Sequence, residues 1–224
     1  MIYKDIAKNF GASVGIKFSE SGMPLYFPGN TFICLLEKDS AIWKTVRNTQ
    51  EALFKTTAGK ALTALPTYSF HMTAIEGICD QVRDSDHWTS LLPTDTELNA
   101  CNDLFDKLIP MMPDFPTVTM RIDHLRIDSA CSIGLYPNTY ADDKLIRDWR
   151  DEMSTLFGIK FPGHDRYGFH IGLGYGLRKL NADEKESLCL LKEKFDSEAR
   201  KSNYTFIPPS PVFVKFDNMF SFGL

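Results

Sequence analysis

Two stretches of this 224-residue sequence decide its fold. The first is Tyr68-Ser69-Phe70-His71-Met72-Thr73-Ala74-Ile75, and the second is Tyr167-Gly168-Phe169-His170-Ile171-Gly172-Leu173-Gly174-Tyr175. Both contain the pattern aromatic–Xaa–Phe–His–apolar, and their alternation with aromatic and β-branched residues predicts strands. Successive side chains of a strand point to opposite faces. His71 therefore shares a face with Thr73, and His170 shares a face with Gly172.

The same order of elements surrounds each of these strands. In the first half we predict a strand at 31–36, a helix at 39–60, the strand at 68–75, a helix at 96–111 and a strand at 117–127. The second half repeats it with a strand at 130–135, a helix at 141–157, the strand at 167–175, a helix ending near Ser202, and closing strands at 211–216 and 219–222. Asn181 and Glu184 have the spacing of a capping box for that last helix. Four apolar residues mark one face of the 141–157 helix: Leu145, Trp149, Met153 and Leu156.

The spacing within the halves also repeats. Thirty-eight residues separate Ile33 from His71, and the same number separates Ser132 from His170, which supports an internal repeat. We therefore expect an α+β fold with two pseudo-symmetric β-α-β lobes and antiparallel sheets around a central cleft. An irregular N-terminal arm at 1–28 would precede a single bilobal domain at 29–224, with lobes at approximately 29–128 and 129–224. Junctions between lobes are common ligand sites, so the histidine faces are expected to look into the cleft.

Composition excludes several functions. The formal net charge of −4 argues against binding long double-stranded nucleic acid, which depends on phosphate neutralisation. The five cysteines form no CxxC pair, a usage typical of reduced thiols in a cytoplasmic protein. No stretch resembles a signal peptide or a membrane span. Cys/His pairs at zinc spacing are missing, so we expect no metal and no cofactor.

Two histidines on facing strands suit the cleavage of a phosphodiester. That reaction takes a proton from the attacking oxygen and gives one to the leaving oxygen, and two imidazoles titrating near neutrality can do both. Thr73 lies on the same face as His71, so its hydroxyl can bind a phosphoryl oxygen. Glycines at 168, 172 and 174 leave space beside His170 for a ligand.

These motifs resemble the 2H phosphoesterase superfamily, which includes the 2′-5′ RNA ligase-like proteins and cyclic nucleotide phosphodiesterases. Pro28-Gly29-Asn30-Thr31, and Phe70-His71-Met72-Thr73 followed by Glu76-Gly77-Ile78, resemble a bacterial and fungal branch of it. The resemblance covers roughly residues 28–224. It implies a metal-independent hydrolase acting on a 2′,3′-cyclic phosphate or a 2′-5′ linked nucleotide or RNA end. His71 and His170 would be its acid and base, with Thr73 holding phosphate.

The second motif departs from the family pattern, because Gly172 stands where the family has Thr or Ser. Gly172 could then contact the phosphate only through its backbone. A water, a backbone N–H or Tyr175 would replace the hydroxyl that Thr or Ser provides in the family. Tyr175 is out of phase with His170 on an ideal strand, so its use would need a bulge. Arg166, just before the second strand, is a further phosphate-binding candidate, ahead of Arg121 and Arg126. The alternative function is a module that binds a nucleotide or phospho-metabolite without turnover.

Overall fold

The strands of the computed structural model, which describes residues 6–222, form one eight-stranded antiparallel sheet in the order β7-β4-β5-β6-β3-β1-β8, with β2 paired to β6. Residues 1–5 of the predicted N-terminal arm lie outside the described range. The strands are β1 Gly29–Leu35, β2 Leu62–Ala64, β3 His71–Cys79, β4 Met120–Ile127, β5 Ala130–Pro137, β6 His170–Gly176, β7 Thr205–Phe206 and β8 Val212–Phe216.

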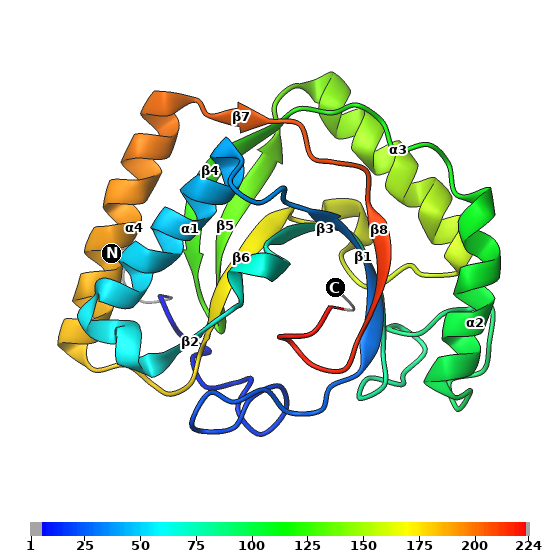
Figure 1. Ribbon diagram of the computed structural model, residues 1–224, viewed down its shortest axis with the longest axis horizontal. Helices are drawn as coiled ribbons and strands as arrows, with labels where there is room; N and C mark the ends of the chain where they lie inside the picture. Colours follow the sequence, from blue (N-terminus) through cyan, green and yellow to red (C-terminus); the bar gives the residue numbers. More distant parts are fainter. Residues whose placement is uncertain (1–5, 223–224) are drawn as a thin grey trace.

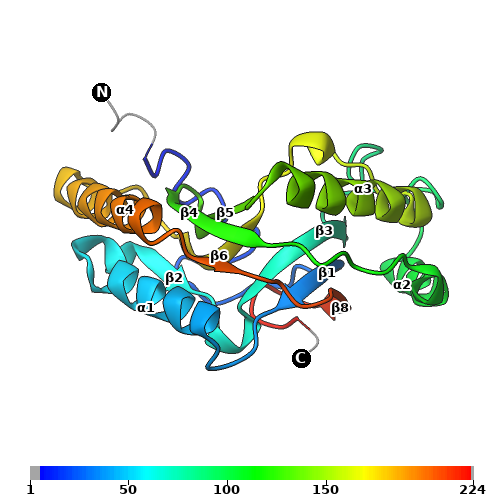
Figure 2. The same ribbon diagram turned by 90° about the horizontal axis from the view of Figure 1, so that it is seen from above.

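The helices gather in two pairs at opposite ends of the sheet (Figures 1 and 2). One pair is α1 (Ala41–Lys55) with α4 (Ala182–Ser202), and the other is α2 (Leu98–Leu108) with α3 (Tyr140–Phe157). Four short 3₁₀ helices complete the described elements: η1 Thr57–Ala61, η2 Thr67–Ser69, η3 Ile109–Met111 and η4 His164–Arg166. The predicted α+β fold is confirmed. Within residues 6–222, no helix is long and apolar enough to cross a membrane.

The two halves of the chain meet at β3 and β6, which lie side by side at the centre of the sheet. Their strand pairing repeats as the sequence spacing predicts, since Ile33 lies opposite Thr73 and Ser132 lies opposite Gly172. One strand of each half pairs with a strand of the other half. Strand β4 of the first half pairs with β5 of the second half, and β8 of the second half pairs with β1 of the first. This exchange ties the halves together and holds the two histidine strands in contact.

Local sequence signals explain several element boundaries. The predicted capping box of α4 is confirmed, with Asn181 Oδ1 accepting from the Glu184 N–H at 2.8 Å and the Glu184 carboxylate accepting from the Asn181 N–H at 2.9 Å. The predicted strand at 219–222 was wrong. There the Asn218 side chain accepts a hydrogen bond from the Phe220 N–H at 2.8 Å, and such an Asx turn bends the chain back.

The core lies between the sheet and the helices. Phe70 just before β3 and Met72 within it are at most 1% exposed, and so are Phe169 and Ile171 at the matching places of β6. Their burial leaves the alternate side chains facing the opposite side of the sheet. The segment 6–28 consists of turns and isolated bridges, and it packs the fully buried Phe18 on that opposite side.

Candidate active site

A hollow of about 340 Å³ lies on the sheet where β3 and β6 meet. Five of the predicted site residues line it: His71, Thr73, His170, Gly172 and Tyr175. Arg166 is exposed on η4 and is not among the lining residues. The remaining lining residues are Asn30, Thr31, Leu65, Glu76, Gly77, Ile78, Cys79, Tyr167, Phe216, Met219 and Phe222. The structure therefore brings together in one cleft both histidines and the hydroxyl group that the sequence singled out.

The two histidines are held in the same way. His71 Nδ1 lies 2.6 Å from the carbonyl oxygen of Ser69, and His170 Nδ1 lies 3.0 Å from that of Gly168. A carbonyl oxygen only accepts hydrogen bonds, so each Nδ1 carries the proton. In the neutral rings, Nε2 is then the unprotonated nitrogen. Both imidazoles are thus fixed in the tautomer that leaves Nε2 to accept or deliver a proton in the cleft.

The surroundings lower the pKa of both histidines. Burial lowers the pKa of His71 from 6.5 to about 4, and the neighbouring His170 acts in the same direction against the Ser69 carbonyl. Burial also lowers the pKa of His170, and Arg126 adds to this, while the Gly168 carbonyl and Glu76 oppose it. Both rings are therefore neutral more readily than a free histidine, and His71 is the harder of the two to protonate.

The strand register determines which groups face each other. Met72 lies opposite Ile171. In an antiparallel pair, moving one residue forward on β3 means moving one residue back on β6, so this register places Thr73 opposite His170 and His71 opposite Gly172. His170 therefore has a hydroxyl across from it, while His71 faces a glycine.

The bulge that Tyr175 needs is present in the structure. The pairing of β5 with β6 passes from Ser132↔Gly172 to Cys131↔Gly174, so β6 has one extra residue at this point. A bulge of this kind turns later side chains to the other face, and Tyr175 accordingly lines the cleft. Its hydroxyl lies 3.8 Å from Met219 Sδ, a weak acceptor.

Two residues outside the predicted set, Glu76 and Tyr167, form the cleft's inner wall, and Arg150 lies behind them. Arg150, on α3, is 1% exposed and pairs with Glu76 at 3.0 Å. Its guanidinium carbon lies 4.1 Å from the centre of the Tyr167 ring, and the Thr73 side chain is close enough to the Tyr167 hydroxyl to act on its pKa. Burial and the nearby Glu76 raise the pKa of Tyr167, so its phenol stays protonated.

No lysine or arginine is among the described residues that line the cleft. Arg126 acts on the charge of His170; its Nη1 donates to the Gly168 carbonyl at 3.3 Å, and its Nε lies 3.3 Å from His124 Nε2. Hydroxyl groups, together with a histidine whose Nε2 is protonated, must therefore make most of the side-chain contacts to an anion in this cleft.

The outer part of the cleft is aromatic and comes from the C-terminal segment. The Phe222 ring lies 4.8 Å from that of His71 and 5.3 Å from that of Phe216. The Tyr68 hydroxyl donates to the Phe220 carbonyl at 2.7 Å, which ties this segment to η2, just before β3. Apolar rings around the histidines account for the desolvation that lowers their pKa.

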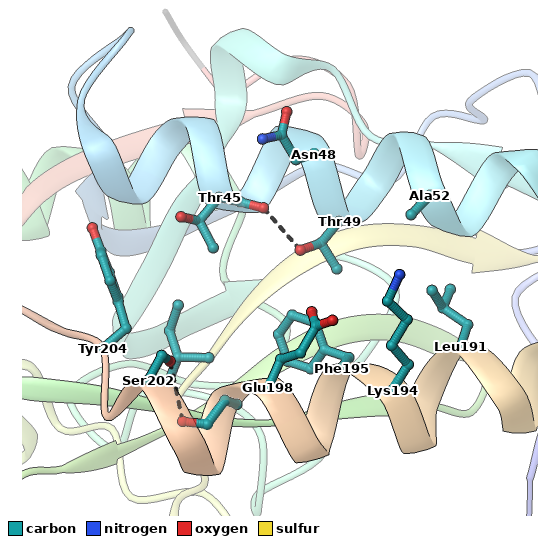
Figure 3. A pocket seen from close by; sticks show the side chains of 12 residues that line it. Thr45, Asn48, Thr49, Ala52, Leu191, Lys194, Phe195, Glu198, Ser202 and Tyr204 are labelled. Carbon is teal, nitrogen blue, oxygen red and sulfur yellow. Dashed lines mark hydrogen bonds between the residues drawn. The ribbon is translucent and has the colours of Figure 1, made fainter.

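A second hollow lacks the paired histidines of this cleft. The groove between α1 and α4, about 440 Å³ in volume, is lined by residues such as Thr49, Ala52, Phe195 and Tyr204 and contains no histidine (Figure 3).

One group of possible metal ligands, Asp151, His164 and Asp165, lies at α3 and η4 outside the cleft. His164 Nε2 contacts Asp151 at 2.9 Å, and Asp165 pairs with Lys160 at 3.6 Å. Arg147 and Arg150 line the same small hollow. Asp151 and Asp165 already have His164 and Lys160 as partners, so these contacts account for the group.

Comparison with known proteins shows the family of the chain. A family model named 2H-phosphodiest, described as a domain of unknown function (DUF1868), matches residues 17–130, about half of the chain. The chain belongs to the 2H phosphoesterase superfamily. No curated protein is significantly similar to it.

One solved structure is similar to this chain over nearly its whole length. The conserved protein of unknown function ATU0111 from Agrobacterium tumefaciens str. C58 aligns with a TM-score of 0.87 and 26% identity over 96% of this chain and 91% of that one. The protein TT0787 of Thermus thermophilus aligns with a TM-score of 0.42 and 10% identity over 84% and 86% of the two chains.

Proposed function

We propose that this protein is a metal-independent phosphodiesterase that hydrolyses a 2′,3′-cyclic phosphate or a 2′-5′ linked nucleotide or RNA end. The observation that carries the proposal is the matched pair of imidazoles, each with Nδ1 bound to a backbone carbonyl in one cleft. Membership of the 2H phosphoesterases supports phosphodiester chemistry. The substrate and the roles below are our proposal.

For a cyclic phosphate the reaction balances with one water. The base takes a proton from water as its oxygen bonds to phosphorus, and the bond from phosphorus to one ribose oxygen breaks. The acid gives its proton to that leaving oxygen, so the product is a phosphate monoester with a free hydroxyl. Each proton transfer of this kind contributes a factor of about 10²–10⁴ to the rate.

We assign the base to His71 and the acid to His170. Burial holds the pKa of His71 near 4, so this ring is neutral at physiological pH and can accept a proton. His170 is easier to protonate, because Glu76 and the Gly168 carbonyl favour its charged form. An entering phosphate anion would add to that effect. Thr73, opposite His170, holds a phosphoryl oxygen beside the acid.

The test is turnover of a panel of 2′,3′-cyclic nucleotides by the full chain in excess EDTA. We expect hydrolysis to a single nucleoside monophosphate at a rate that EDTA does not change. Loss of activity in EDTA with recovery on adding a divalent cation would contradict the metal-independent mechanism. No turnover of any cyclic or 2′-5′ linked substrate would contradict the proposed reaction.

The pH dependence of kcat/KM should follow the two lowered pKa values. The base is active above its pKa, so the acidic limb lies near the pKa of His71, about 4. The acid is active below its pKa, so the alkaline limb lies below the ordinary histidine value of 6.5. We expect a bell with its maximum between these limits, because kcat/KM reports the free enzyme.

Arg126 lowers the pKa of His170, so Arg126→Gln should move the alkaline limb of this bell to higher pH. Arg121→Gln is the matched control, since Arg121 lies on the same strand and pairs with Asp123 at 3.7 Å. An alkaline limb above pH 7 in the wild type, or one that Arg126→Gln leaves in place, would contradict the assignment of His170 as the acid.

A binding module is the second candidate. The glycine at position 172, directly across from His71, favours it, because one hydroxyl of the family pattern is missing. This candidate predicts binding of a nucleoside monophosphate by calorimetry with no turnover of the corresponding cyclic phosphate.

A further inference from the structure

The cleft must hold a phosphate anion with few donors. No lysine or arginine is among its described lining residues, and the side chain at position 172 is absent. Thr73 supplies one hydroxyl. Of the other lining donors, Asn30 Nδ2 already donates to Asn102 at 2.7 Å and Thr31 Oγ1 already donates to the Ile75 carbonyl at 3.2 Å. A second side-chain hydroxyl for a phosphoryl oxygen must therefore come from one of the two lining tyrosines, Tyr167 or Tyr175.

Tyr167 places a hydroxyl next to that of Thr73. Its ring lines the cleft at the end occupied by His170 and Glu76, with its centre 6.2 Å from that of His170. The Thr73 side chain is close enough to the Tyr167 hydroxyl to act against the rise of its pKa. Hydroxyl protons rotate, so both groups can turn to donate to an oxygen atom that enters the cleft.

Arg150 fixes the Tyr167 ring from behind. The guanidinium stacks on the ring at 4.1 Å, close enough for a cation–π contact. Arg150 itself is held by Glu76 at 3.0 Å and by a hydrogen bond from Nη1 to the Ala74 carbonyl. A positive charge on the ring face withdraws electron density from the phenol, which makes its O–H a better donor to an anion.

We propose that Tyr167 is a catalytic residue that donates its hydroxyl to a phosphoryl oxygen, in place of the hydroxyl missing at position 172, and that Arg150 is the residue that positions it. The proposal rests on the proposed function, because it concerns the same phosphate. It differs from the alternative that Tyr175, admitted to the cleft by the bulge in β6, fills this role.

The test compares Tyr167→Phe with Tyr175→Phe. Tyr167→Phe removes one oxygen and keeps the ring that Arg150 stacks on, so the fold should be unchanged. We expect it to lower kcat/KM for 2′,3′-cyclic nucleotides by about 10- to 100-fold, at or below the cost of deleting one oxyanion donor. Tyr175→Phe should change it by less than about threefold, on the same comparison. Tyr140→Phe, at an 84% exposed position on α3, controls for the substitution itself.

A binding measurement keeps the proposal separate from turnover. Calorimetry with adenosine 3′-monophosphate should show weaker binding to Tyr167→Phe than to wild type. If the wild type binds this nucleotide but turns nothing over, and Tyr167→Phe binds it more weakly, then the proposed reaction fails and the phosphate contact stands. Unchanged binding and kinetics in Tyr167→Phe, or a larger loss in Tyr175→Phe, would overturn the proposal.

The role of Arg150 has its own readout. Arg150→Lys should lower kcat/KM in the wild-type background but add little in the Tyr167→Phe background, because residues that act through one another are not additive. Equal losses in both backgrounds would mean that Arg150 supports the structure without positioning Tyr167.

Discussion

His170→Ala is expected to lower kcat/KM for a 2′,3′-cyclic nucleotide by about 10³-fold, the middle of the range for a proton-transfer group. For bis(p-nitrophenyl) phosphate the same variant should lose less than about tenfold, since p-nitrophenolate leaves without a proton and needs no acid. His71→Ala should lose about 10³-fold on both substrates, because the attacking water must still lose its proton. Steady-state kinetics with the two substrates therefore separate the two roles.

His87→Ala is the control for these variants. His87 is partly exposed, pairs with Asp84 at 2.8 Å and lies outside the cleft, so its loss should leave both activities unchanged. The reverse pattern, with His71→Ala rescued by the better leaving group, would exchange the two assignments. Full activity in either alanine variant would remove the two-histidine mechanism altogether.

The sequence predicts those site residues whose positions follow from the alternation of side chains along a single strand. The two-residue period of a strand places His71 with Thr73, and His170 with Gly172, and all four line the cleft. The equal spacing from Ile33 and Ser132 predicts matching registers, and the pairing of these residues with Thr73 and Gly172 shows the match. The start of α4 is set by its capping box.

The inner wall of the cleft escaped prediction because its partners are distant in sequence. Arg150 and Glu76 are 74 residues apart, and no local pattern reports such a contact. One signal was available on α3. Trp149 and Met153 of the predicted apolar face are buried, but Leu145 is 48% exposed, and the buried face also contains Ile146 and Arg150. An arginine on the buried face of a helix indicates a paired charge, and the prediction left Arg150 out of that face.

The periodicity of the sequence likewise did not predict that β4 and β8 each pair with a strand of the other half. Alternation fixes which face of a strand is buried, but not which neighbour it pairs with. The C-terminal residues next to His71 were expected as a strand, and the Asx turn at Asn218 places Phe222 against the imidazole instead. The desolvation that sets the pKa of His71 therefore depends on tertiary packing.

Arg150→Met is expected to lower the free energy of unfolding by about 3 kcal/mol, the lower end of the cost of breaking a buried ion pair. The lower end applies because the Glu76 side chain is 35% exposed and keeps some contact with water, whereas Arg150 is 1% exposed. The variant leaves the Glu76 carboxylate and the Ala74 carbonyl without their donors. A loss of this size corresponds to a fall in Tm of about 10 °C for a chain of this length.

Arg147→Met, on the same helix, is the matched control. Arg147 pairs with Asp143 at 2.8 Å, with both side chains about a third exposed, and such pairs contribute about 1 kcal/mol or less. The double variant Arg150→Met/Glu76→Gln should recover part of the stability that Arg150→Met loses, because no unpaired charge remains behind the cleft. Chemical denaturation of the four proteins measures all of these differences. If Arg147→Met and Arg150→Met lose the same free energy of unfolding, the Arg150–Glu76 ion pair behind Tyr167 contributes no more to stability than an exposed pair. Another interaction would then have to hold the Tyr167 hydroxyl in place.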